Sequence, residues 1–181
     1  MKLLLALFLF APAALAQIAF VSSPSACGPG DESLKVKLDD APHAPEPPEP
    51  NKARIYFIHE SGGGPAIAYP TTKIGMDGAW VGANHSVSYF SVSVAPGEHH
   101  LCATLQSSFY SGGFELAHVD AEAGKTYFYR TRLILSRSVE LLELELIDSD
   151  QGTHLVNSLP LSLSRSNKEK PVRQTVPKSS R

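Results

Sequence analysis

From residue 53 onward the chain is a succession of short runs in which apolar and polar side chains alternate, and turn residues separate most of them. Alternation with a period of two is typical of a β-strand with one buried face. The runs lie at 53–59, 72–76, 79–83, 88–94, 99–106, 115–121, 125–135 and 140–147. About eight such strands, without a convincing long helical period, predict an all-β fold, either an antiparallel β-sandwich or a partly open barrel.

The run at 99–106 indicates which face of its strand is buried. Leu101, Ala103 and Leu105 share one face, whereas His100 and Cys102 lie on the other. We therefore expect the leucine face in the core and Cys102 on the outer face. Earlier in the chain, Asp77-Gly78 is typical of a two-residue hairpin turn, because such turns require positive φ at both positions.

The run at 140–147, ELLELELI, alternates leucine with glutamate. As a strand it would place Leu142, Leu144 and Leu146 on one buried side and the glutamates on the other. A helix is the alternative, since leucine and glutamate are both good helix formers. The strict period of two favours the strand.

The first 16 residues have the features of a secretory signal peptide. Lys2 provides the charged head, an apolar run extends from Leu3 to Phe10, and Ala14 and Ala16 provide the small residues of a cleavage site. The run is shorter than the ~20 residues of a membrane-spanning helix, and no later stretch qualifies as a span. We expect cleavage after Ala16 and a periplasmic or secreted product without a transmembrane segment; the alternative is an uncleaved N-terminal anchor.

The mature chain is expected to form one domain. Residues 17–52 are interpreted as an N-terminal extension that contains a short half-buried strand at 34–38 and a proline-rich connector at 40–52. Residues 53–164 form the predicted β-sandwich domain, and its last part, 152–164, fits either a short helix or an edge strand. Residues 165–181 are basic and almost without apolar side chains, which predicts a disordered tail.

Two cysteines, Cys27 and Cys102, remain after the predicted cleavage. An exported protein meets an oxidising compartment, so a single disulfide is the natural pairing, and it would fasten the N-terminal segment to the outer face of the sheet. The alternative is two free thiols, one of them reactive or metal-binding.

Five stretches in order carry a resemblance to a known family: ARIYFIHE, KIGMDGAWVG, SYFSVSVAPGEHHLCA, EAGKTYFYRTRL and ELELIDSDQG. Together they resemble the bacterial family catalogued as domain of unknown function 2846, over roughly residues 53 to 150. The D-G hairpin followed by P-G-x-H is also similar to the small envelope modules called PEGA domains. The resemblance implies an immunoglobulin-like or PEGA-like sandwich and an exported location, and it implies no activity.

The sequence contains no constellation that we interpret as catalytic, and we expect neither an enzyme nor a cofactor. His99 and His100 are adjacent on a strand and point to opposite faces, so they do not chelate one ion together. His100 and Cys102 share a face and are the candidates for a metal site, provided that Cys102 is not oxidised. His59 and Glu60 end a strand without metalloprotease spacing, which indicates a solvated rim.

Aromatic side chains near turns are the candidates for a binding surface: Trp80, Phe109 and Tyr110. The net charge of −2, from 16 basic and 18 acidic residues, gives no general attraction to nucleic acid. The favoured hypothesis is an exported, non-catalytic module whose partner is an envelope protein or polysaccharide. The alternative is a metal-binding protein or metal-dependent enzyme that uses His100 and Cys102 with other histidines.

Overall fold

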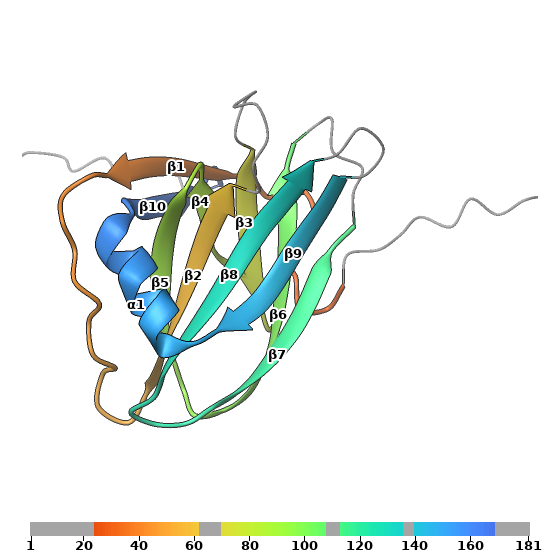
Figure 1. Ribbon diagram of the computed structural model, residues 1–181. Helices are drawn as coiled ribbons and strands as arrows, with labels where there is room; N and C mark the ends of the chain where they lie inside the picture. The colour runs from red at the N-terminus through yellow and green to blue at the C-terminus, as the bar shows by residue number, and fades with distance from the viewer. Residues whose placement is uncertain (1–23, 62–69, 108–112, 136–139, 169–181) are drawn as a thin grey trace, which may run out of the picture.

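Two β-sheets pack against each other in the computed structural model, which describes residues 24–61, 70–107, 113–135 and 140–168 (Figure 1). The larger sheet has six strands in the order β1 (Leu34–Asp39), β10 (Leu161–Ser166), β5 (Ser88–Val94), β2 (Ala53–Ser61), β8 (Thr126–Leu135) and β9 (Glu140–Ile147). The smaller sheet has four strands in the order β4 (Ala79–His85), β3 (Thr71–Met76), β6 (Gly97–Gln106) and β7 (Glu115–Ala121). The predicted all-β sandwich is confirmed.

The described residues form ten strands rather than the predicted eight. The difference arises because β1 and β10 pair with each other and extend the larger sheet. Strand pairing is largely antiparallel, but β2 at the centre of the larger sheet pairs parallel with β8 along its whole length. A parallel neighbour requires a long crossover, and here the four strands of the smaller sheet, together with β5, lie between β2 and β8 in the chain.

The main core lies between the two sheets. It includes Leu101, Ala103 and Leu105 on β6, as alternation predicted, together with Ile55, Phe57 and their neighbours. The segment at 140–147 is a strand, and Leu142 is only 1% exposed. Leu146, however, is 58% exposed. The prediction of a fully one-sided strand is wrong there, because β9 is the outermost strand of its sheet and only part of its inner face is covered.

The helix α1 (Ser149–Ser158) packs on the outer face of the larger sheet, beside β2 and β8 (Figure 1). Its N-cap is Asp148, whose side chain accepts a hydrogen bond from the Gln151 amide at 2.9 Å. Val156 packs on this face against the aromatic rings of Tyr56, Tyr89 and Phe128 and against Ile58. The segment at 152–164 thus contains the end of a helix and then part of β10. Among the described residues, no helix is long and apolar enough to cross a membrane.

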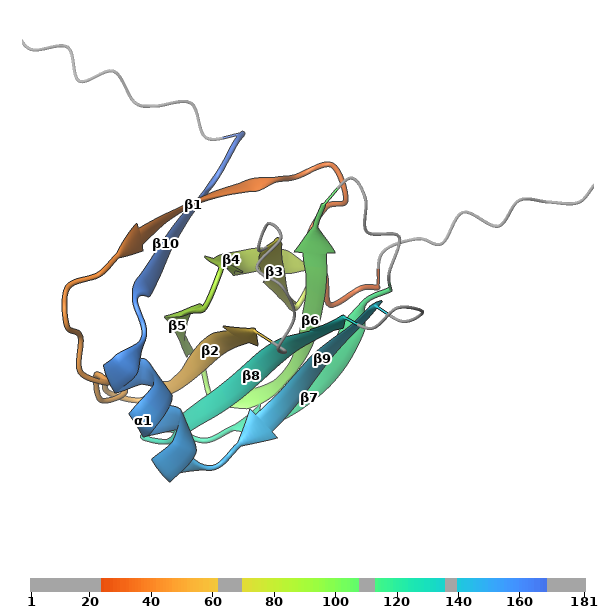
Figure 2. The same cartoon turned by 45° about the horizontal axis from the view of Figure 1, so that its top comes forward.

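Strands β1 and β10 form a two-stranded antiparallel ribbon, hereafter the β1–β10 ribbon. It lies across β4 at one side of the sandwich (Figure 2) and joins the larger sheet through a short parallel contact between β10 and β5. β1 comes from the segment that the sequence sets apart as an N-terminal extension. The connector at 40–52 contains no strand, and its Glu46 amide donates to the Tyr56 hydroxyl at 2.6 Å. The domain boundaries drawn from the sequence stay predictions.

Candidate functional site

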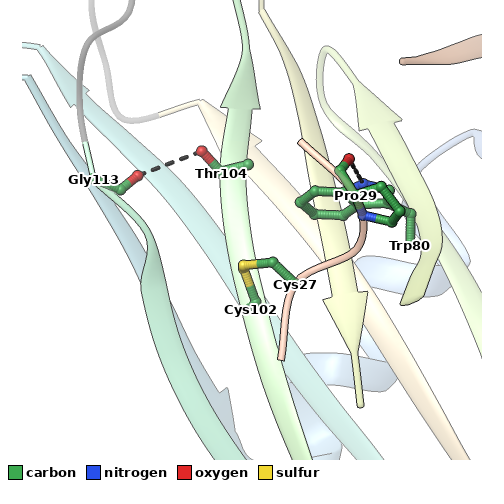
Figure 3. Close-up of a disulfide and its surroundings, with 6 residues drawn as sticks. All are labelled: Cys27, Pro29, Trp80, Cys102, Thr104 and Gly113. Carbon is green, nitrogen blue, oxygen red and sulfur yellow. Dashed lines mark hydrogen bonds between the residues drawn. A yellow bond between two sulfur atoms is a disulfide. The ribbon is translucent and has the colours of Figure 1, made fainter. Parts of the chain in front are cut away.

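A disulfide joins Cys27 to Cys102, with the two Cα atoms 5.3 Å apart (Figure 3). Cys102 is fully buried, but it lies on the outer face of the smaller sheet, opposite the leucine face of β6. The sequence predicted both the pairing and the face, and the structure confirms them. The bond fastens residues 24–33, the N-terminal strap, across that outer face.

Several further contacts hold the strap against the sheet. The Gly78 amide donates to the Ala26 carbonyl at 3.2 Å, and the Lys73 ammonium donates to the Glu32 carbonyl at 2.8 Å. Gly75 on β3 permits this close approach, because a Cβ at that position would lie 2.9 Å from the backbone of Ala26 and Cys27. Burial lowers the pKa of Lys73, and the charge of Glu32 opposes that change. The strap is therefore an integral layer of the fold.

Trp80 lies half-buried beneath the strap (Figure 3). Its indole N–H donates to the Pro29 carbonyl at 2.8 Å, and the Lys73 ammonium lies 4.0 Å from the ring centroid on its face. Contacts within the fold therefore already engage both the indole N–H and the ring face of Trp80. A binding role for Trp80 stays a prediction, as does one for Phe109 and Tyr110, which lie outside the described residues.

The residues proposed for metal binding do not meet as a metal site. Cys102 is consumed by the disulfide and offers no thiolate. The exposed imidazole of His100 lies 3.7 Å from a Glu98 oxygen, and His100 is the register partner of His118 on β7. Within the described residues, no group of three or more His, Cys, Asp or Glu side chains is placed to hold a metal ion.

His59 is not part of a solvated rim, because it is 1% exposed and lies between the sheets. Its Nδ1 is 2.9 Å from the Thr131 hydroxyl and 3.4 Å from the Thr72 hydroxyl. Burial lowers the pKa of His59 to about 4. The imidazole is therefore neutral at ordinary pH. The prediction is wrong because β2 is the central strand, so its neighbours β5 and β8 and the opposing sheet enclose its end.

The turn between β3 and β4 has the backbone conformation that the sequence predicted. Asp77 and Gly78 have φ values of 52° and 89°. The Asp77 carboxylate contacts His99 Nδ1 at 2.6 Å and accepts from the His100 amide at 2.9 Å. Partial burial opposes the charge of both groups. Burial is the largest single influence on each pKa, but the His99–Asp77 hydrogen bond, the backbone hydrogen bonds of the two side chains and their opposite charges together outweigh it, so the pKa of His99 is raised and the pKa of Asp77 is lowered.

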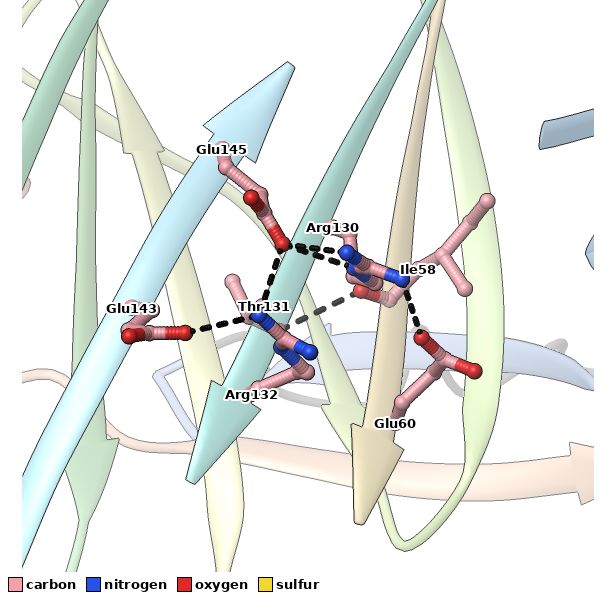
Figure 4. Close-up of polar contacts among 7 residues, drawn as sticks. All are labelled: Ile58, Glu60, Arg130, Thr131, Arg132, Glu143 and Glu145. Carbon is pink, nitrogen blue, oxygen red and sulfur yellow. Dashed lines mark hydrogen bonds and ion pairs between the residues drawn. The ribbon is translucent and has the colours of Figure 1, made fainter. Parts of the chain in front are cut away.

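A ladder of ion pairs lies on the outer face of β2, β8 and β9, beside the part that α1 covers (Figure 4). Arg130 lies between Glu60 at 2.9 Å and Glu145 at 2.5 Å. Arg132 contacts Glu143 at 3.1 Å and Glu145 at 3.2 Å. Each arginine therefore has carboxylate partners, and this face is locally compensated.

The outward face of the β1–β10 ribbon has a different charge pattern. The most exposed side chains there are Lys35, Lys37, Leu163 and Arg165, a set that we call the cationic ribbon face. Asp39, at the end of β1, lies on the same side, and its carboxylate contacts His43 at 3.5 Å. Lys35 is the register partner of Arg165, and Lys37 is the partner of Leu163. No carboxylate among the described residues forms an ion pair with these three cations, which surround a hollow of about 480 Å³. Sequence reasoning missed this face, because it depends on the pairing of two segments near opposite ends of the chain.

Comparison with family models, with curated proteins and with solved structures found no match to this chain. The resemblance to the family catalogued as domain of unknown function 2846 therefore stays a prediction. The finer description of the sandwich as immunoglobulin-like or PEGA-like also stays a prediction.

Proposed function

We propose that this protein is an exported, non-catalytic binding module that contacts a protein or polysaccharide in the bacterial envelope or outside the cell. Export is supported by the charged head, apolar run and small-residue cleavage site of the first 16 residues. The Cys27–Cys102 disulfide also supports export, since such bonds persist in oxidising compartments.

The cationic ribbon face is the observation that carries the binding function. Three other surfaces of the described molecule are covered or compensated: the strap lies on the smaller sheet, α1 lies over part of the larger sheet, and carboxylates pair with Arg130 and Arg132. Lys35, Lys37 and Arg165 have no such carboxylate partner among the residues that the structure describes. Charged groups that a fold leaves unpaired around a hollow are available to a ligand.

A tagged full chain, expressed with its own leader and cross-linked in the native envelope, tests this function. Mass spectrometry of the purified protein should give Gln17 as the first residue, and the cross-linked material should contain a reproducible protein or glycan. The matched variants are Lys35→Glu with Lys37→Glu, and Lys125→Glu as a control at an exposed turn of the same chain. Well-folded bait that retains nothing would contradict the proposal.

A metal-binding function is the second candidate, and the register of His100 with His118 is the observation that favours it. Two imidazoles on opposed strands can share one ion, but water would have to supply the other ligands. Zinc or copper retained in a one-to-one ratio after dialysis, and lost in His118→Gln, would favour this candidate over the binding module.

A further inference from the structure

The cationic ribbon face contains a pair of like charges that the fold does not neutralise. Lys35 and Arg165 are directly opposed across an antiparallel pair, where Cβ atoms lie about 5 Å apart. Lys37 is two positions along the same strand, which places it about 7 Å from Lys35. Like charges in direct opposition destabilise a sheet. Three cations at this spacing are suited to one or two anionic groups held between them.

Leu163 completes the face with a different chemistry. It is 49% exposed and lies opposite Lys37, at the side of the hollow that Lys35, Lys37 and Arg165 also line. An apolar surface within a cationic rim fits a ligand whose body presents C–H groups and whose substituents are anionic. Sugar rings that bear acidic groups have this combination.

We propose that the cationic ribbon face binds the carboxylate or phosphate groups of an acidic polysaccharide. Arg165 offers a planar fork of N–H donors, which suits either anion, and the two lysines add mobile ammonium groups. The C–H surface of the sugar lies on Leu163. This inference rests on the proposed binding function and names its ligand class.

Other polyanions fit this face less well. A protein on duplex DNA commonly neutralises about six to ten phosphates, whereas the face offers three cations. Interfacial membrane binding requires a continuous apolar face, and Leu163 is the one exposed large hydrophobic residue of the ribbon. A stable protein interface is enriched in aromatic side chains at its centre, and neither β1 nor β10 contains one.

The test measures the affinity of the full processed chain for polygalacturonate and for phosphorylated dextran, with neutral dextran as the uncharged control. We expect both acidic polymers to bind and neutral dextran not to bind. Raising the salt concentration should weaken binding, because exposed charges are screened over about 8 Å at physiological ionic strength. Failure of both acidic polymers to bind at low salt would overturn the assignment.

Matched variants locate the site on the ribbon. Lys35→Glu with Lys37→Glu should weaken binding about tenfold or more, a change of ~1.4 kcal/mol shared by two contacts. Lys35→Gln with Lys37→Gln removes the two positive charges without adding negative ones and should also weaken binding. Lys125→Glu should leave the affinity within about twofold, because one exposed contact far from the site contributes little. Equal losses in the ribbon variant and in Lys125→Glu would overturn the site.

Two further measurements separate competing explanations. Replacing Lys170, Arg173, Lys178 and Arg181 with glutamine tests the basic tail. If that change abolishes binding while the ribbon variants still bind, the site assignment is wrong.

Polyglutamate, single-stranded DNA or anionic lipid vesicles that bind as tightly as polygalacturonate would show attraction to charge alone and would overturn the polysaccharide assignment. If the ribbon variants still capture the envelope partner, the proposed function stands and this site does not.

Discussion

The outer face of the smaller sheet and the outward face of the β1–β10 ribbon both contain lysine, and the fold treats the two differently. Lys73, beneath the strap, is 6% exposed, and a carbonyl and an indole ring contact its ammonium group. Lys35 and Lys37 are exposed, and Lys35 faces another cation. On the first face, covalent and polar contacts serve the stability of the domain. On the second, the like charges of Lys35 and Arg165 destabilise the sheet and are not offset by a partner among the described residues.

This difference separates structural from binding surfaces within one molecule. A group that stabilises the fold has its partners inside the fold, as Cys102 and Trp80 do. A group that destabilises the fold without a partner is a candidate for contact with something else. The changes below test this separation.

Removal of the disulfide should have the largest effect. Cys27→Ser with Cys102→Ser opens a loop with a sequence separation of 75 residues, and we expect the free energy of unfolding to fall by about 4 kcal/mol. Urea denaturation measures this, and reduction of the wild-type protein should give the same change. Polygalacturonate affinity should be retained when the variant is folded. A decrease of less than about 1 kcal/mol in the free energy of unfolding would show that the other contacts hold the strap in place without the disulfide.

Lowering the pH tests the interior, which belongs to neither surface. The pKa of His59 is about 4 in the folded protein and about 6.5 in the unfolded chain. Between these pH values, only the unfolded chain binds a proton at His59. Stability should therefore fall as the pH falls from 6.5 to 4, by up to about 3 kcal/mol.

His59→Gln provides the comparison for this pH dependence. The variant should lose most of the fall, as measured by denaturant unfolding at several pH values. His99 acts in the opposite sense, because its raised pKa contributes stability below the unfolded value that is lost as the pH rises through the folded value. The His99 contribution is the same in the wild-type protein and in His59→Gln, so it cancels when the two pH curves are subtracted. Parallel pH curves would contradict the assignment to His59.

A milder change separates the strap from the ribbon. Trp80→Phe keeps an aromatic ring beneath the strap but removes the N–H that donates to Pro29, so we expect a loss of about 1 kcal/mol in stability. Polygalacturonate affinity should not change. If affinity falls together with stability, the strap face takes part in binding and the two surfaces are not distinct.

The smallest expected effect is an increase in stability, whereas the changes above all lower it. Lys35→Gln removes the repulsion from Arg165, and we expect the unliganded protein to gain about 0.3 kcal/mol in low salt. High salt should erase the gain, and Lys125→Gln should show none. Thermal unfolding at two salt concentrations measures both. A loss of stability in Lys35→Gln would mean that the lysine serves the fold.

Features set by neighbouring residues were predictable from the sequence. The Asp77-Gly78 turn depends on the φ preferences of two residues, and the faces of β6 depend on alternation alone. The outward position of Cys102 followed from the same alternation. With only two cysteines in a chain predicted to be exported, the disulfide followed as well.

Features set by distant pairing were not predictable in this way. His59 is buried because β2 is central, and its partner strands β5 and β8 come much later in the chain. The parallel pairing of β2 with β8 leaves no mark in the local pattern. The cationic ribbon face depends on the register that opposes Lys35 to Arg165. Each of its strands, read alone, is an ordinary half-buried strand with a solvated face.

The pairing of β1 with β10 also determines when the ribbon can form. Leu34 at the start of β1 pairs with Ser166 at the end of β10, so the first described strand has no antiparallel partner until the last one is present. Contacts this distant in sequence are slow to form. During synthesis from the N-terminal end, β1 therefore has no pairing partner until the residues of β10 have been made. A chain cut short before β10 would lack Arg165 and Leu163, so the ribbon face exists only when the segment through Ser166 is present.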